Sequence, residues 1–205
     1  MTAIVCCTGE RLQRKLNRDD LQWIIDRSLE KSKKVPTHLE AVWLHPYCQG
    51  LTVDIGCGAE KVLPSVLGID KLQFGEKGHF GCMNGVPAVA DVSADAGNLD
   101  FIPDETVDSA VSRHCFEHLP NPMRTIAEWL RILKKGGKLA MVLPNDHWKD
   151  FLNMDKDHKF QCFPETVERA VKALNALNGP VTGKLLDNGR MVFQDWSFFS
   201  LIERV

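Results

Sequence analysis

The sequence predicts an α/β fold with a mostly parallel, seven-stranded sheet, helices on both faces and a C-terminal antiparallel hairpin. Short apolar segments rich in Val, Ile, Leu and Ala alternate with longer segments whose apolar residues recur at helical spacing. The short segments are continuously apolar, which is typical of strands covered on both faces. Two more strand-like segments close the chain, with Asn188-Gly189 between them as the expected hairpin turn.

A helix is expected over residues 17–33, because Leu21, Ile24 and Ile25 recur at helical spacing behind an Asn/Asp cap. A second is expected over residues 120–135, which end in two lysines and two glycines as a stop signal. A third begins at Pro164 and runs to Leu177. The expected strands cover residues 51–55, 66–70, 86–91, 107–112, 138–144, 183–186 and 191–204.

Length and composition favour one domain over residues 1–205, with a helical lid in residues 1–49 and a binding core in residues 50–205. The net charge of −2 shows no cationic excess, so no nucleic-acid partner is expected. The seven cysteines are scattered without a CxxC pair, which favours reduced thiols in a cytoplasmic protein. There is neither a signal-peptide pattern nor an apolar stretch of membrane-spanning length, so no membrane partner is expected.

The expected ligand site lies at the carboxyl ends of the strands, where open parallel sheets bind ligands. The first of these strands ends in the sequence Asp-Ile-Gly-Cys-Gly at residues 54–58, whose glycines allow a sharp turn and a close approach to a ligand. Asp70 ends the second strand and can accept hydrogen bonds from ribose hydroxyls. Asp95 follows the third strand, where it can face an adenine amine, and residues 113–118 follow the fourth. The purely structural alternatives are a plain strand-to-helix turn for residues 54–58 and a surface Asp for Asp70.

In their order and spacing these segments resemble class I S-adenosylmethionine-dependent methyltransferases of the small methyltransferase-domain type. The family's Asp-x-Gly-x-Gly matches residues 54–58, and its acidic ribose-binding residue matches Asp70. Its remaining motifs match residues 95–101, 104–108, 117–119 and 131–137. The branch with a Gly-Cys-Gly-x-x-Lys turn and a later Asp-x-x-His is the most similar, and those motifs correspond to residues 56–61 and 155–158.

The resemblance implies a Rossmann-like class I methyltransferase fold with S-adenosylmethionine as cofactor. The residues that it assigns to cofactor binding are Asp54, Ile55, Gly56, Cys57, Gly58, Asp70, Lys71, Asp95, Ala96, Arg113 and His114. The implied reaction is methyl transfer to a small-molecule or sugar-containing acceptor, whose atom and pathway the sequence does not indicate. No metal site is expected, and the oligomeric state is not indicated.

His114, His118 and His158 are the candidate general bases for a hydroxyl acceptor, because His titrates near neutral pH. Helix-cap or loop histidines are the alternative for all three. A nicotinamide oxidoreductase is disfavoured, because Lys61 stands where a third glycine would be expected. A catalytically inactive S-adenosylmethionine-binding partner or sensor stays open as an alternative function.

Overall fold

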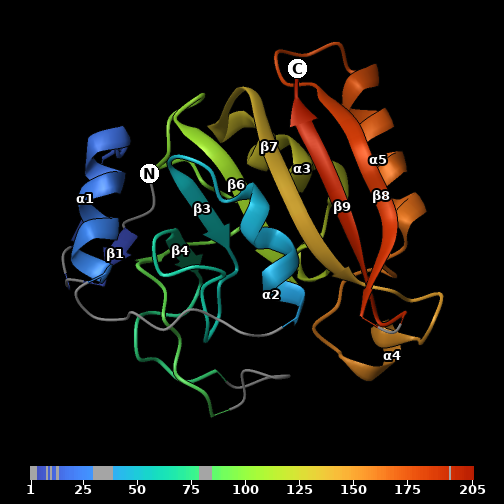
Figure 1. Ribbon diagram of the computed structural model, residues 1–205, viewed down its shortest axis with the longest axis horizontal. Helices are drawn as coiled ribbons and strands as arrows, with labels where there is room; N and C mark the ends of the chain where they lie inside the picture. The colour runs from blue at the N-terminus through green and yellow to red at the C-terminus, as the bar shows by residue number, and fades with distance from the viewer. Residues whose placement is uncertain are drawn as a thin grey trace.

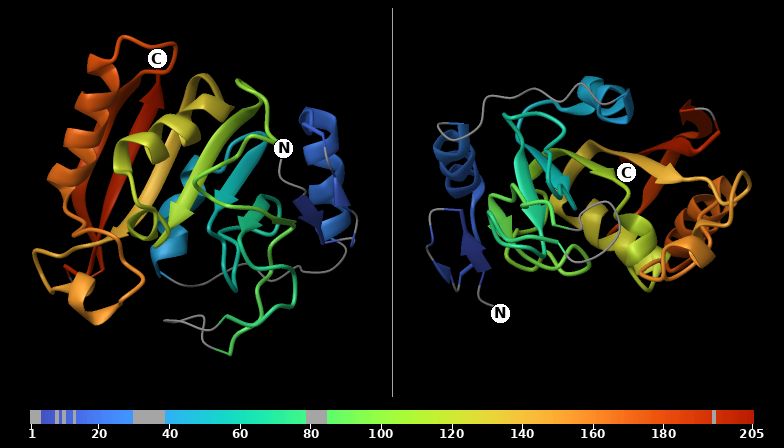
Figure 2. Two further views of the ribbon diagram at one scale, coloured as in Figure 1. Left: turned by 180° about the vertical axis from the view of Figure 1, so that it is seen from behind. Right: turned by 90° about the horizontal axis from the view of Figure 1, so that it is seen from below.

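The computed structural model describes residues 4–7, 9, 11–12, 14–29, 39–78, 85–193 and 195–205. Within them, a single nine-stranded sheet runs in the order β2-β1-β5-β4-β3-β6-β7-β9-β8. Helix α2 (Leu39–Leu44) covers one face, and α3 (Pro122–Ile132) and α5 (Pro164–Ala176) cover the other (Figure 1, Figure 2). The predicted α/β class with helices on both faces is therefore confirmed.

Five parallel strands form the centre of the sheet, and two antiparallel strands continue it. The chain order reverses between β3 and β6, which lie side by side. This reversal opens the crevice in which sheets of this kind bind ligands. In sheet order the strands are β5 (Val92–Ser93), β4 (Leu67–Asp70), β3 (Thr52–Ile55), β6 (Val107–Arg113), β7 (Leu133–Pro144), β9 (Ser197–Arg204) and β8 (Gly183–Phe193).

The N-terminal segment adds two strands that were not predicted, so the expected count of seven strands was wrong. Strand β1 (Ile4–Cys6) pairs antiparallel with β5, and β2 (Arg11–Leu12) pairs with β1. Without β1, the short strand β5 would be an edge strand with unpaired backbone groups. Residues 1–49 are therefore not purely helical, although α1 (Arg18–Leu29) and α2 lie within them. The expected end of the first helix at residue 33 lies outside the described residues.

The strand expected over residues 86–91 is also wrong, because the third parallel strand is the following pair, Val92–Ser93. Within the earlier segment, the N–H groups of Ala88 and Val89 donate to loops, and only the N–H of Asp91 at its end reaches β4, at the Gly68 carbonyl. The Ala88 N–H donates to the Glu76 carbonyl at 2.8 Å, and the Val89 N–H donates to the Gly58 carbonyl at 2.9 Å. The segment therefore packs beneath the turn after β3 instead of extending the ladder.

The C-terminal hairpin is present, but its turn is not at Asn188-Gly189. Strand β8 continues through those residues to Phe193 and pairs with β9 along its length. Its register shifts three times, between residues 185 and 187, 188 and 190, and 191 and 193. The Asn188 side chain donates 2.8 Å to the carbonyl of Pro164, so it anchors β8 to the start of α5 instead of forming a turn.

The segment Lys134–Gly137, predicted to stop a helix, is part of β7. Helix α3 ends two residues earlier, at Ile132, and begins with an Asn121 cap whose side chain accepts the Arg124 N–H at 3.1 Å. A short helix, α4 (Phe151–Met154), precedes α5. Among the described residues, none of these helices has the length and apolar character needed to cross a bilayer.

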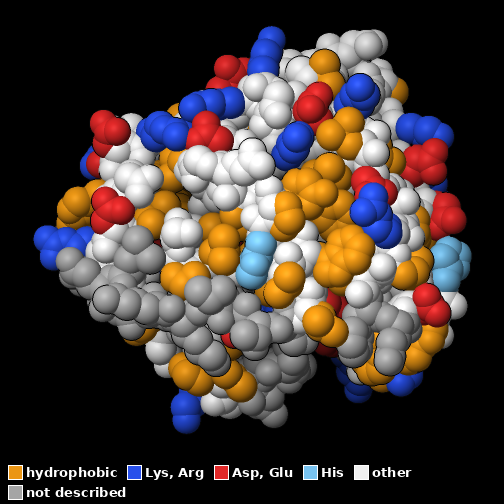
Figure 3. All heavy atoms as spheres, in the orientation of Figure 1, with side chains coloured by type: hydrophobic (Ala, Val, Ile, Leu, Met, Phe, Trp, Pro, Cys, Tyr) orange, Lys and Arg blue, Asp and Glu red, His pale blue; other side chains and the backbone are white. Residues whose placement is uncertain are grey.

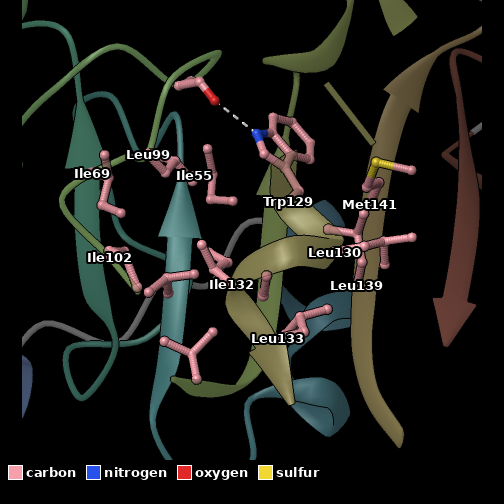
Figure 4. Packing of buried hydrophobic residues seen from close by; sticks show 14 of the residues in the cluster. Ile55, Ile69, Leu99, Ile102, Trp129, Leu130, Ile132, Leu133, Leu139 and Met141 are labelled. Atoms are coloured by element: carbon pink, nitrogen blue, oxygen red, sulfur yellow. Dashed lines mark hydrogen bonds between the residues drawn. The ribbon is translucent and has the colours of Figure 1, made fainter. Parts of the chain in front are cut away.

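The main core lies between the sheet and α3, α5 and α1. Figure 4 shows the part of it around α3. Trp129 is fully buried in it, and its indole N–H donates 2.8 Å to the carbonyl of Ala96. A smaller apolar cluster under α2 covers the opposite face and includes Leu44, Val142 and Phe199. Because both faces are packed, ligand access is directed to the loops at the strand ends.

Candidate cofactor site and acceptor side

The turn after β3 lies against the end of β4. The N–H groups of Gly56 and Cys57 both donate to the Ile69 carbonyl, at 2.8 and 3.1 Å. The Gly58 N–H donates to Oδ2 of Asp70 at 2.9 Å. Gly56 and Gly58 adopt φ of +76° and +56°, where glycine is favoured. The two predicted features, the glycine turn and the acidic strand end, therefore lie together.

Asp70 is held by the backbone on both sides of its carboxylate. Besides the Gly58 N–H, the Leu72 N–H donates to Oδ1 at 3.0 Å. An ionised carboxylate has about four lone-pair positions, so two backbone donors leave room for two more hydrogen bonds. The half-buried Asp70 thus has the orientation and the capacity to accept two neighbouring hydroxyls.

Glycine is required at position 56 for two reasons: its φ is positive, and the Cys115 side chain lies too close to leave room for a Cβ atom. A Cβ atom added there would lie 2.4 Å from both Cβ and Sγ of Cys115. Cys115 follows β6, so this contact joins the two strand ends at the point where the chain order reverses. The turn after β3 can keep this position only with a hydrogen at residue 56.

Asp54 is buried beneath the glycine turn and supports it. It is 1% exposed, and its Oδ2 accepts the Val62 N–H at 2.7 Å. Burial raises the pKa of this carboxyl to about 7, although that hydrogen bond and the charges of Arg113 and Lys61 oppose the shift. Asp54 therefore fixes the backbone that follows the glycine turn. Ile55 and Cys57 are buried beside it, whereas Lys71 is exposed.

Lys61, the last residue of the Gly-Cys-Gly-x-x-Lys turn, is buried and ion-paired. Its Nζ lies 2.9 Å from Oδ2 of Asp91 and also donates to Ser28 and to the carbonyls of Pro64 and Val66. All three donor positions of the ammonium are thereby used within the protein. Lys61 holds the first crossover together and does not face a ligand.

The turn after β5 carries the predicted adenine-facing residues. Asp95 is exposed, and its Oδ1 accepts the Gly97 N–H at 2.8 Å. Ala96 is fixed from below by its hydrogen bond with Trp129. At the end of β6, the guanidinium of Arg113 lies 4.0 Å from Glu60. These residues follow parallel strands of the sheet and therefore lie at the same edge as Asp70.

His114 is held between two carboxylates. Its Nε2 lies 3.2 Å from both carboxylate oxygens of Glu40, and its Nδ1 lies 3.5 Å from Oε1 of Glu117. Burial by itself would lower the pKa of His114, but Glu117 and Glu40 outweigh burial and raise the pKa to about 10. His114 is therefore an imidazolium at neutral pH, and it has no free position for a substrate proton.

Glu40 and Ser197 were not found from the sequence. The Ser197 hydroxyl donates to Glu40, so α2, β6 and β9 meet at His114. Glu40 and His114 are 74 positions apart, and neither Glu40 nor Ser197 belongs to a recognisable motif. No local signal could have paired them.

His118 and His158 converge on Glu117. Each Nε2 lies 3.9 Å from Oε1 of Glu117, and the two rings meet edge to face with centroids 4.8 Å apart. Burial lowers the pKa of His158 despite the nearby carboxylate, which favours a neutral ring. The Lys159 N–H donates 2.8 Å to the Glu117 carbonyl, which fastens the later loop to the end of β6. Two of the predicted histidines thus lie together, and Nδ1 of His114 approaches the same Oε1 of Glu117.

A hollow lined by Val171, Asn175 and Leu185 lies between α5 and β8. The hollow adjoins the start of β8, which pairs with the end of β9. The end of β9 in turn pairs with the amino-terminal half of β7. It is therefore at the opposite edge of the sheet and is not part of this site.

Comparison with known proteins places a family match on the same segment. Residues 53–141 match the family model described as a methyltransferase domain. An uncharacterized 37.1 kDa protein in transposon TN4556 of Streptomyces fradiae is 29% identical over 149 residues. That alignment covers 67% of this chain, and the chain spans 38% of the length of that relative.

Solved structures share the fold at low sequence identity. A SAM-dependent methyltransferase from Archaeoglobus fulgidus has a TM-score of 0.53 at 18% identity, covering 89% of this chain and 99% of its own. A geranyl diphosphate methyltransferase in complex with GPP and sinefungin has a TM-score of 0.52 at 14% identity, covering 80% and 77% of the two chains. The sheet order and these solved structures show the Rossmann-like α/β fold of class I methyltransferases. Residues 53–141 are similar to a methyltransferase domain, and the indicated cofactor is S-adenosylmethionine.

Proposed function

We propose that this protein transfers a methyl group from S-adenosylmethionine to a small-molecule or sugar-containing acceptor. One observation carries the proposal: the hydrogen bond from the Gly58 N–H to Asp70 joins the glycine turn and the acidic strand end beside the strand-order reversal. A nucleoside bound there would have its ribose at Asp70 and its remaining part along the turn.

The cofactor would be held by three of these loops. Asp70 and Lys71 would flank the ribose, Asp95 and Ala96 the adenine, and the turn over residues 56–58 the amino-acid part. Asp54 and Ile55 would support the turn from below, and Arg113 and His114 would close the site from the end of β6. S-adenosylmethionine would supply a methyl group on a sulfonium, from which a neutral thioether leaves readily. The chain would then need to orient the acceptor and to exclude water.

The acceptor side would be formed by His118 and His158, which lie beyond His114 and close to Glu117. An acceptor hydroxyl must lose its proton in the reaction. Unlike His114, the rings of His118 and His158 are not held between two carboxylates. His114, fixed as a cation, would position Glu117 instead of accepting the proton. A small acceptor is supported by the low net charge of −2 and by the GPP complex of a structure with this fold.

The test has a binding step and a transfer step. Calorimetric titration with S-adenosylmethionine and with S-adenosylhomocysteine should give submillimolar binding of both. Metabolite fractions incubated with the protein and methyl-labelled cofactor should then yield a labelled small molecule. Absence of binding at submillimolar concentration would overturn the cofactor assignment, and binding without transfer to any fraction would overturn the enzymatic assignment.

A further inference from the structure

We propose that Glu117, His118 and His158 form a binding site for one divalent transition-metal ion, with Zn²⁺ as the ion that fits the donor set. Two imidazoles and one carboxylate are the protein ligands of one well-known class of catalytic zinc site. The three residues come from two segments, the turn after β6 and the loop before α5, that the fold brings together.

The first argument is the state of the Glu117 carboxylate. The residue is 0% exposed, and neither Oε1 nor Oε2 has a hydrogen-bond partner among the described residues. The nearest ring nitrogens lie 3.5 Å from Oε1 for His114 and 3.9 Å from it for His118 and His158. A buried carboxylate without hydrogen bonds is costly, and a bound cation would remove that cost.

The second argument is geometric. One ligand atom from each of the three residues lies within 4.8 Å of the others, and both Nε2 atoms lie 3.9 Å from Oε1 of Glu117. Tetrahedral zinc with bonds of about 2.0–2.1 Å places its ligands roughly 3.3 Å apart. Small rotations of the two imidazoles, which move each Nε2 by less than about 1 Å, would bring the ligand atoms to the spacing that a bound ion needs.

The third argument is that the ligands are rigidly mounted. The hydrogen bond from the Lys159 N–H to the Glu117 carbonyl joins the residues next to His158 and His118 directly. Phe116 and Phe160 pack edge to face across the same two segments, with centroids 5.4 Å apart. Preorganised ligands of this kind lose little entropy when a metal binds. Glu117 also faces His114, whose Nδ1 lies 3.5 Å from the same Oε1, in the place that outer partners of metal ligands take.

The cluster also has an open side. The His118 side chain is 35% exposed, whereas that of His158 is 7% exposed. Three protein ligands would leave the fourth tetrahedral position to water or to an acceptor oxygen. This last step rests on the proposed function: a metal-bound hydroxyl would lose its proton more readily, and the two histidines would then act as ligands instead of as bases.

The site can be tested by metal binding alone. Full-length protein treated with a chelator and then freed of it should bind one Zn²⁺ per chain in a calorimetric titration, with Kd in the micromolar range or tighter. Co²⁺ in its place should give the visible absorption of a four-coordinate site. His118→Ala, His158→Ala and Glu117→Gln should each weaken Zn²⁺ binding at least 10-fold.

The matched control is His147→Ala, which removes an exposed histidine paired with Glu165 and should leave Zn²⁺ affinity unchanged. Circular dichroism of each variant checks that it is folded. No saturable Zn²⁺ binding, or binding that the three substitutions leave unchanged because cysteine thiols hold the ion, would overturn the proposal. S-adenosylhomocysteine binding by the same samples separates this result from the cofactor assignment, because either can fail while the other holds.

Discussion

The backbone N–H of Gly58 donates a hydrogen bond of 2.9 Å to Oδ2 of Asp70, which ties the turn after β3 to the end of β4. Twelve positions separate the two residues. This contact sets the distance between the loop that would follow the amino-acid part of the cofactor and the carboxylate that would hold its ribose.

The substitution Asp70→Ala is expected to weaken S-adenosylhomocysteine binding at least 10-fold, because it removes the proposed acceptor for two ribose hydroxyls and releases the Gly58 and Leu72 N–H groups. Calorimetry measures the affinity. Glu168→Gln, which changes an exposed carboxylate on α5, is the control and should bind like the wild type. Equal affinities for Asp70→Ala and wild type would contradict the ribose assignment.

Gly56→Ala is expected to lower the free energy of unfolding by about 2–4 kcal/mol, because the new Cβ would lie 2.4 Å from Cys115 in a backbone of positive φ. Gly136→Ala is a matched control. Its φ is also +76°, but no heavy atom lies within 4 Å of the added Cβ, so only the strain of about 1 kcal/mol applies. Urea unfolding of both variants separates the two costs, and equal losses would show that the Cys115 contact is unimportant.

The buried Asp54 carboxyl makes stability fall as pH rises. Its pKa is about 7 in the folded protein, against about 3.9 in an unfolded chain, so only the unfolded state loses this proton between pH 4 and 7. Because of this group, the free energy of unfolding of the wild type should fall by about 2–4 kcal/mol between pH 4 and 7. Relative to wild type, Asp54→Asn should become steadily more stable from pH 4 to pH 7 and then level off.

Urea unfolding at several pH values measures this difference. Asp104→Asn is the control, because the hydrogen bond from Arg131 lowers the pKa of the Asp104 carboxyl and moves its titration below that window. Parallel stability profiles for the wild type and Asp54→Asn would show that Asp54 is charged in the folded protein at pH 5.

Lys61→Met is expected to cost about 3–5 kcal/mol of stability, because it leaves Asp91 buried without its cation. The double variant with Asp91→Asn should recover part of this loss, since the amide oxygen still accepts the Gly68 N–H without a charge. Lys172→Met removes an exposed ion pair with Glu168 and should change stability by less than about 0.5 kcal/mol. Thermal and urea unfolding give all three values. A small cost for Lys61→Met would show that the ammonium is solvated.

The glycine turn and Asp70 could be predicted because both follow short apolar strands, and neighbouring parallel strands end at one edge. The place of the third strand could not be predicted from local pattern. Residues 86–91 have strand-like composition, but the N–H groups of Ala88 and Val89 bond to loops, and Val92–Ser93 forms the ladder with β4. The pairing of β1 with β5 depends on contacts between residues nearly 90 positions apart, which periodicity does not indicate.

The three candidate histidines could be named from the sequence, but their arrangement could not be predicted. His114, His118 and His158 were singled out by type and by their positions after strands. Their different environments depend on Glu40 and Glu117, which enclose His114 and leave the other two rings facing one buried carboxylate. The expectation of no metal site rested on sequence spacing, and spacing gives no sign that the loop carrying His158 is fastened to Glu117.

The three register shifts along β8 affect how the molecule can associate with other chains. β8 is the last strand at its end of the sheet, and a regular edge strand offers a repeating row of N–H and C=O groups to any incoming strand. Each shift breaks that row and increases the local twist. Continuous strand addition, and with it fibrous aggregation through this edge, is therefore disfavoured while the native hairpin is intact.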